Sequence, residues 1–200
     1  MLRKTCVAFA LGLVLAASPV LAKTKILSAA ADRTNEGSKI TVVLGVPKAL
    51  TRDGVTTIGD GRLANDTLYA FPEQQGVTLA NGLSLSGSRP IAAGTKVDSF
   101  YVCLDTSENA RGAGPRGGLG YEAVLRFDNG ALLGTALRPS GLAETAQVLG
   151  NPDLSYANSR FLGVDPYWMG QDSQSFAAGN FVFRGNANGI DCIRLIFRAK

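Results

Sequence analysis

The side chains of this sequence that could do acid–base chemistry are carboxylates, because the 200-residue chain contains no histidine. That absence excludes Ser-His-Asp and Cys-His catalysis and histidine-containing zinc sites. Two carboxyl groups flanking a glycosidic bond are still enough for a glycoside hydrolase. Three pairs are close in sequence: Asp98 with Asp105, Glu122 with Asp128, and Asp165 with Asp172. We favour a simpler interpretation, solvated acids at turns and strand ends, because turns are predicted at these places.

Four aspartates, Asp98 and the set Asp53, Asp60 and Asp66, also have interpretations other than catalysis. Asp98 leads into a predicted strand, where its side chain can accept hydrogen bonds from backbone N–H groups. Asp53, Asp60 and Asp66 are spaced through a glycine-rich stretch, and carboxylate oxygens on a loop are ligands that calcium prefers. Their spacing does not follow the D-x-[DN]-x-[DN]-G loop, so an ordinary solvated loop is favoured. The sequence therefore predicts no metal and no other cofactor.

The only tryptophan, Trp168, stands next to Tyr167 in the stretch GVDPYWMGQD, which is expected to be a loop. Such a pair could stack on a sugar ring or anchor a protein partner, since flat rings offer a large contact area at low entropic cost. The alternative is a tryptophan folded back over the end of the core, which general burial tendencies favour. This pair is the best candidate for a ligand-binding site in the sequence.

The stretch RGAGPRGGLG contains a G-x-G-x-x-G pattern at Gly112, Gly114 and Gly117. A dinucleotide fingerprint needs a helix after its third glycine, whereas the following residues have the composition of another strand. We therefore expect a long hairpin connection between two antiparallel strands. Arg111 and Arg116 at its exposed tip could touch an acidic partner.

The first 22 residues have the pattern of a secretory signal peptide. Two basic residues precede the apolar run VAFALGLVLAA, and SPVLA supplies small residues before Lys23. The mature chain is expected to begin near Lys23, to be secreted or periplasmic, and to contain no integral membrane segment. The leader holds two of the 20 basic residues and no acidic one, so 18 basic and 16 acidic residues remain. Their even spread argues against nucleic-acid binding.

Two cysteines, Cys103 and Cys192, remain once Cys6 is removed with the leader. An even pair in an exported protein is more often a disulfide than two separate buried thiols, which are the alternative. A bridge closing so long a loop would contribute roughly 4–5 kcal/mol in the chain-entropy model. Side-chain alternation puts both cysteines on the more polar face of their strands. We therefore expect a bridge nearer the surface than the core.

Short apolar runs bounded by turn-forming residues predict a chain made mostly of strands. The predicted strands are residues 39–46, 66–71, 76–80, 96–105, 121–128, 131–137, 174–185 with a break considered at Gly179, and 190–199. Asn129-Gly130 favours a two-residue type I′ hairpin. One helix is predicted at 140–149, with Ser140 as its cap and Gly150 at its end.

The fold class that follows is all-β: a jelly-roll-like antiparallel β-sandwich with one short helix. In this organisation residues 1–22 form the signal peptide, and residues 23–65 are the N-terminal strand and loop region of the same domain. Residues 66–200 form the core of the sandwich.

Several short motifs follow one another in an order that resembles a known group of proteins. They are FPEQQGVTL, IAAGTKVDSFYVCLD, VLRFDNGALLG, LGNPDLSY and GIDCIRLIF, within residues 68–197. In that order they resemble uncharacterised secreted bacterial proteins, some of which carry a C-terminal PEP-CTERM sorting signal. The resemblance implies a β-sandwich and an extracellular location, and it supplies no catalytic residues. The sequence departs from the group in ending at Lys200 without the sorting signal and in having the cysteine pair.

The sequence as a whole favours an exported, non-enzymatic structural or binding protein of the cell surface, periplasm or extracellular matrix. One alternative is a carbohydrate-binding module that uses Tyr167 and Trp168. The second is a histidine-free glycoside hydrolase with paired carboxylates. The expected partner is a glycan or a cell-surface protein.

Overall fold

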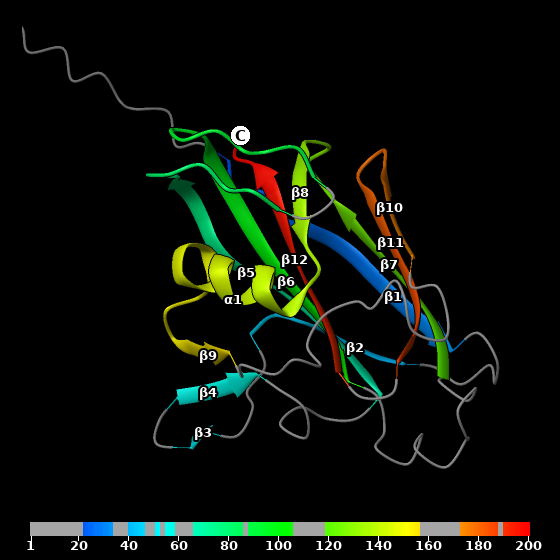
Figure 1. Ribbon diagram of the computed structural model, residues 1–200. Coiled ribbons are helices and arrows are strands. Elements are labelled where there is room, and N and C mark those ends of the chain that lie inside the picture. The colour runs from blue at the N-terminus through cyan, green and yellow to red at the C-terminus, as the bar shows by residue number, and fades with distance from the viewer. Residues whose placement is uncertain are drawn as a thin grey trace, which may run out of the picture.

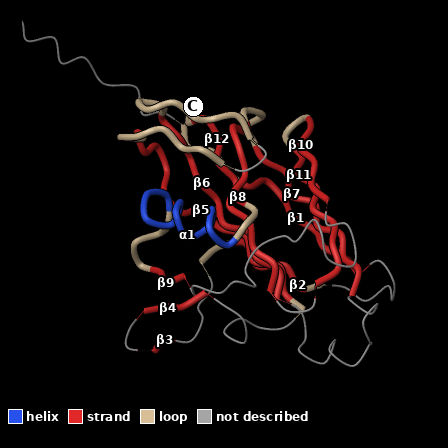
Figure 2. Tube along the Cα trace, viewed as in Figure 1, coloured by secondary structure: helices blue, strands red, loops and turns tan. Residues whose placement is uncertain are grey.

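The protein is a β-sandwich of two facing sheets, with a helix on the outside of the larger sheet (Figure 1). The computed structural model describes residues 22–33, 40–46, 51–52, 55–58, 66–85, 88–105, 119–156, 173–187 and 190–200. The predicted all-β class is confirmed, and most of the described residues lie in strands, shown red in Figure 2.

Each sheet draws its strands from distant parts of the chain. The five-stranded sheet has the order β2 (Thr41–Leu44), β5 (Thr67–Thr78), β6 (Lys96–Asp105), β12 (Ile190–Arg198) and β8 (Leu132–Ala136). The four-stranded sheet has the order β1 (Ile26–Arg33), β7 (Leu119–Phe127), β11 (Asn180–Ala187) and β10 (Ser173–Ala177). A small third sheet consists of β3 (Thr51–Arg52), β4 (Val55–Ile58) and β9 (Leu154–Tyr156).

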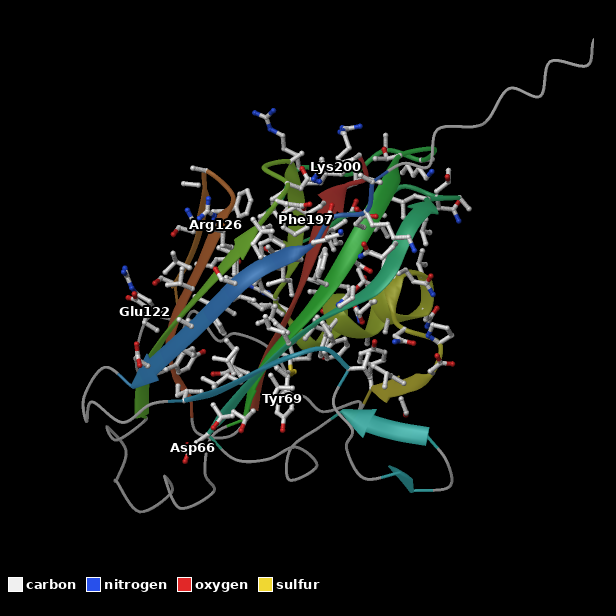
Figure 3. The ribbon with its side chains drawn as sticks, turned by 180° about the vertical axis from the view of Figure 1, so that it is seen from behind. Asp66, Tyr69, Glu122, Arg126, Phe197 and Lys200 are labelled. Carbon is white, nitrogen blue, oxygen red and sulfur yellow. A yellow bond between two sulfur atoms is a disulfide. The ribbon has the colours of Figure 1, made fainter. Side chains whose placement is uncertain are left out.

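The main core lies between the two large sheets, and strand alternation selects its residues. On β6 it contains Phe100, Val102 and Leu104, which the sequence had placed on one face. From β12 it contains Ile193, Leu195 and Phe197, which also share a face as predicted. Phe100, Phe127 and Phe197 pack their rings against one another with centroids 4.7–5.7 Å apart. Phe197 is labelled within this layer in Figure 3.

A second core covers the opposite face of the five-stranded sheet. The helix α1 (Pro139–Leu149) packs there, together with Leu79, Leu85 and Ile91 from the segment between β5 and β6. The central sheet is therefore buried on both faces. This layer explains why the predicted position of the cysteines near the surface is wrong: the face that carries them is polar in sequence, yet it lies beneath the helix.

The type I′ hairpin predicted at Asn129-Gly130 is wrong, because β7 and β8 belong to different sheets. Neither residue has the positive φ that such a turn requires. The buried side-chain amide of Asn129 donates to the Thr24 hydroxyl and to the backbone carbonyl of Arg198, at 2.9 and 2.8 Å. Asn129 therefore connects the start and the end of the described fold instead of making a tight turn.

Two other turns follow the left-handed geometry that their residues provide. Ala178 and Gly179 have φ of 49° and 79° and join β10 to β11 as an antiparallel hairpin, which confirms the break considered at Gly179. The two strands predicted at 66–71 and 76–80 form a single strand, β5, whose pairing with β6 is irregular around Gly76 at φ 71°. β5 therefore continues past Gly76 as one strand, with a local shift in its register against β6.

The helix is one residue longer than predicted at its N-terminus. Its cap is Arg138, without a side-chain hydrogen bond, and Pro139 occupies the first turn, so the predicted cap at Ser140 is wrong. Proline is favoured there because its fixed φ suits the first turn and the turn needs no N–H donor. Gly150 ends the helix as expected. A membrane-crossing helix is absent from the described ranges, where α1 has only 11 residues.

The glycine-rich stretch also connects different sheets. β6 ends at Asp105 in the five-stranded sheet, and β7 begins at Leu119 in the four-stranded sheet. The connection is therefore a crossover, and the predicted hairpin between two antiparallel partners is wrong. A strand follows it, as the sequence indicated, so the helix of a dinucleotide fingerprint is missing. The three glycines and the two arginines of the motif lie outside the described residues.

Candidate functional site

The predicted disulfide is present at the centre of the five-stranded sheet. Cys103 of β6 and Cys192 of β12 lie directly opposite each other in the antiparallel register, with Cα atoms 4.1 Å apart. Both residues are fully buried. Tyr69 of β5 is the register partner of Cys103 on the other side, and the sulfur atoms appear beside it in Figure 3. The bridge therefore covalently fixes the pairing of two neighbouring central strands.

A buried ion pair lies on the same face of the sheet, under α1. The guanidinium of Arg194 in β12 binds both carboxylate oxygens of Glu73 in β5, and both side chains are fully buried. The Nη1 of Arg194 also donates to the backbone carbonyl of Leu142, at 2.8 Å, and to the Thr145 hydroxyl. The Tyr156 hydroxyl donates to Glu73. One cluster thus links the sheet, the helix and β9.

Two tyrosine rings enclose the Arg194 guanidinium. Its Cζ lies 5.1 Å from the ring centroid of Tyr101 and 5.3 Å from that of Tyr156, within reach of cation–π attraction. Burial raises the pKa of both tyrosines, and the negative charge of Glu73 adds to the effect. Burial opposes the charge of Arg194, but the hydrogen bonds and charge of Glu73 raise its pKa above the ordinary value. Because the charged groups of this cluster already bind one another, we interpret the cluster as a structural contact between the sheet and the helix, and not as an open reaction site.

Three of the carboxylates considered for catalysis, Asp98, Glu122 and Asp128, have structural partners among the described residues. Asp98 is buried and accepts hydrogen bonds from the backbone N–H groups of Thr24, at 2.9 Å, and Gly76, at 2.7 Å. The sequence analysis had suggested this role for Asp98, in which its side chain accepts hydrogen bonds from backbone N–H groups. Asp98 and Asp105 are seven residues apart on one strand, which separates their backbones by about 23 Å.

The second pair is also far apart along one strand. Glu122 forms an ion pair with Arg184 across neighbouring strands, on the outer face of the four-stranded sheet in Figure 3. Asp128 accepts the backbone N–H of Lys25 at 2.8 Å and forms an ion pair with Lys200 at 2.9 Å. Six residues of extended chain separate the two acids by about 20 Å, beyond the carboxyl separation of either glycosidase class.

The other candidate residues fall largely outside the described ranges. These are Asp165 and Asp172, the aromatic pair Tyr167 and Trp168, and Asp53 and Asp60 of the calcium hypothesis. Asp66 is described, immediately before β5, with φ 54°. Within the described residues no three acidic or cysteine side chains gather in a way that could hold a metal ion.

The candidate binding site is a concave surface between the edge strands of the two sheets. It has a volume of about 300 Å³. We call it the β8–β10 cleft, and its lining consists of Ser88, Arg89, Leu132, Leu133, Gly134, Thr135, Gln174, Ser175, Phe176 and Phe181. β8 and β10 are each the last strand of their sheet, and they lie beside each other in Figure 1. The Gln174 amide donates to the Thr135 hydroxyl at 3.1 Å and bridges the sheets.

The loop before β6 forms one wall of the cleft because it approaches β8 at Gly134. A Cβ on Gly134 would come within 3.2 Å of Ser88 and within 3.0 Å of Leu85, so a larger residue would push this wall away. The Ser88 hydroxyl accepts the backbone N–H of Thr135 at 3.4 Å. The next residue, Arg89, is exposed and has no hydrogen bond or ion pair among the described residues.

Sequence reasoning did not identify this cleft, because its residues come from three separated segments. Ser88 and Arg89 stand in no motif, and β10 was predicted only as the first part of a strand over residues 174–185, with a break considered at Gly179. The predicted strand over residues 174–185 was the only local signal, and it indicated no binding surface. No protein-family model, curated protein or solved structure matches the chain.

Proposed function

We propose that the protein is an exported, non-enzymatic binding protein of the periplasm, cell surface or extracellular space, and that the β8–β10 cleft is its binding surface. The observation that carries the export part is the disulfide between Cys103 and Cys192. Disulfides persist in oxidising compartments and are rare where thiols are kept reduced. The leader at residues 1–22 supports the same assignment, and so does the resemblance to secreted bacterial proteins.

The position of the bridge strengthens the argument from compartment. Both cysteines are fully buried in the middle of the five-stranded sheet, and they belong to the second core, to which α1 also contributes. The cysteines sit opposite each other with their backbones already at bridging distance, so folding itself brings the thiols together. A chain with this arrangement is suited to fold where an oxidant is present.

The binding part of the proposal rests on what the cleft contains. It offers hydroxyl, amide and guanidinium groups over an apolar floor, and its described lining has no carboxylate to act as an acid or a base. Of the carboxylates that were considered for catalysis, Asp98 accepts backbone N–H groups and Glu122 forms an ion pair with Arg184. Ligand pockets of proteins have this mixture of apolar walls and a few polar groups.

Cell fractionation tests the export part of the proposal. The full chain and a chain starting at Lys23 would be expressed in the same Gram-negative bacterium, and thiols would be blocked with an alkylating reagent before lysis. We expect the full chain in the periplasm or medium, shortened at its N-terminus and without free thiols. The chain lacking the leader should stay in the cytoplasm with both cysteines alkylated. A full-length cytoplasmic protein in the first case would contradict export.

A further inference from the structure

We propose that the β8–β10 cleft binds a small organic anion, with its acidic group at Arg89 and its apolar part on the floor between the sheets. This inference rests on the proposed binding function, and it names the class of ligand. Among the described strands, β8 and β10 are each the edge of their sheet, and the cleft lies between these two edges.

The charge of the cleft indicates whether its ligand is an anion or a cation. Arg89 is the one ionisable side chain in the described lining of the cleft, and it has no partner among the described residues. The guanidinium is always charged and presents N–H donors in a fork that matches a carboxylate, sulfonate or phosphate. The cleft therefore has a local positive charge with unused donors, which favours an anion over a neutral or cationic ligand.

The polar groups around Arg89 add further donors and acceptors. Gln174 uses one N–H on Thr135, which leaves the second N–H and a carbonyl oxygen for a ligand. Ser175 is exposed at the rim, where its hydroxyl can rotate to donate or accept. These groups can orient an acidic head group that the arginine attracts.

The floor of the cleft selects for an apolar body on the ligand. Leu132, Leu133, Phe176 and Phe181 contribute apolar surface, and Phe176 is only half-buried. Inorganic phosphate or sulfate would leave this surface in contact with water, whereas an aromatic or aliphatic body would cover it. The volume of about 300 Å³ is at the lower end for ligand pockets, so the body is small.

A matched pair of fluorescent probes tests this inference on the purified, oxidised mature chain. The anionic probe is 8-anilinonaphthalene-1-sulfonate, and the neutral probe is N-phenyl-1-naphthylamine, which has the same ring system without the sulfonate. Fluorescence titrations of both probes would be performed with wild-type protein and three variants. Arg89→Gln removes the charge, Gln174→Glu adds a repelling charge, and Arg126→Gln removes an exposed arginine on the outer face of the four-stranded sheet (Figure 3).

We expect the sulfonate to bind the wild type and the Arg126→Gln variant equally, and the neutral probe to bind more weakly. Arg89→Gln should weaken sulfonate binding by about tenfold or more, the loss typical of one charged hydrogen bond. Gln174→Glu should weaken it as well, and neither change should affect the neutral probe. Equal binding of both probes, or sulfonate binding that Arg89→Gln does not change, would overturn the inference. Neither result would affect export, which fractionation measures separately.

Discussion

Replacing Arg194 with methionine probes the buried ion pair that links α1 to the sheet. Arg194 donates four hydrogen bonds, two to Glu73 and one each to Leu142 and Thr145. Without Arg194, the Tyr156 hydroxyl is the one hydrogen-bond donor that this cluster leaves to the fully buried carboxylate of Glu73. Removing one member of a buried pair costs about 3–5 kcal/mol because the other charge stays uncompensated. Such a loss is a large part of the total stability of a domain, about 5–15 kcal/mol.

Urea unfolding at neutral pH, with the disulfide intact, measures this loss as a shift of the midpoint at constant slope. The double variant Glu73→Met/Arg194→Met should be more stable than Arg194→Met alone, because it removes both charges from the interior. Arg184→Met is the matched control, since it breaks an exposed pair with Glu122 and should cost no more than about 1 kcal/mol. A loss below 1 kcal/mol for Arg194→Met, or a double variant less stable than the single one, would refute the reasoning.

Three further outcomes follow from the same contacts. Cys103→Ala/Cys192→Ala should lose roughly 4–5 kcal/mol in urea unfolding, as expected for a loop of 89 residues; an equal midpoint would contradict it. Asp98→Asn should lose about 1–3 kcal/mol, because an amide cannot accept the N–H groups of Thr24 and Gly76 with both of its heavy atoms. For Asp128, burial opposes ionisation, but the Lys25 N–H and Lys200 hold its pKa below the ordinary value. Its ionised form therefore stabilises the fold above the unfolded pKa of about 3.9, and this contribution disappears as pH falls through the lower folded pKa. Asp128→Asn should be less stable than wild type at pH 7, and the difference should disappear as pH falls below the folded pKa of Asp128, as thermal unfolding across pH would show.

The sequence was sufficient for the elements whose pattern is local. The strand at 96–105 has the predicted bounds, and the alternation of Phe100 and Val102 with Tyr101 and Cys103 correctly separates the two faces. The helix and the break at Gly179 were also found, because proline, glycine and apolar spacing act within a few residues. The pairing of the strands that carry Cys103 and Cys192 could be predicted because two cysteines in an exported protein are expected to form a disulfide.

Features that depend on distant partners were not predictable from local pattern. Asn129-Gly130 has the composition of a hairpin turn, yet its amide is held by Thr24 and Arg198, which are remote in sequence. Arg194 marked its face as polar, although Glu73 and α1 bury it. The β8–β10 cleft arises where the edges of two sheets meet, and strand order is not encoded in any single segment.

The intact mass of the protein recovered from an exporting bacterium tests the central claim most directly. We predict a chain that begins at Lys23 and gains two hydrogen atoms, about two daltons, when the Cys103–Cys192 bridge is reduced. A full-length chain whose mass does not change on reduction would contradict both export and the bridge.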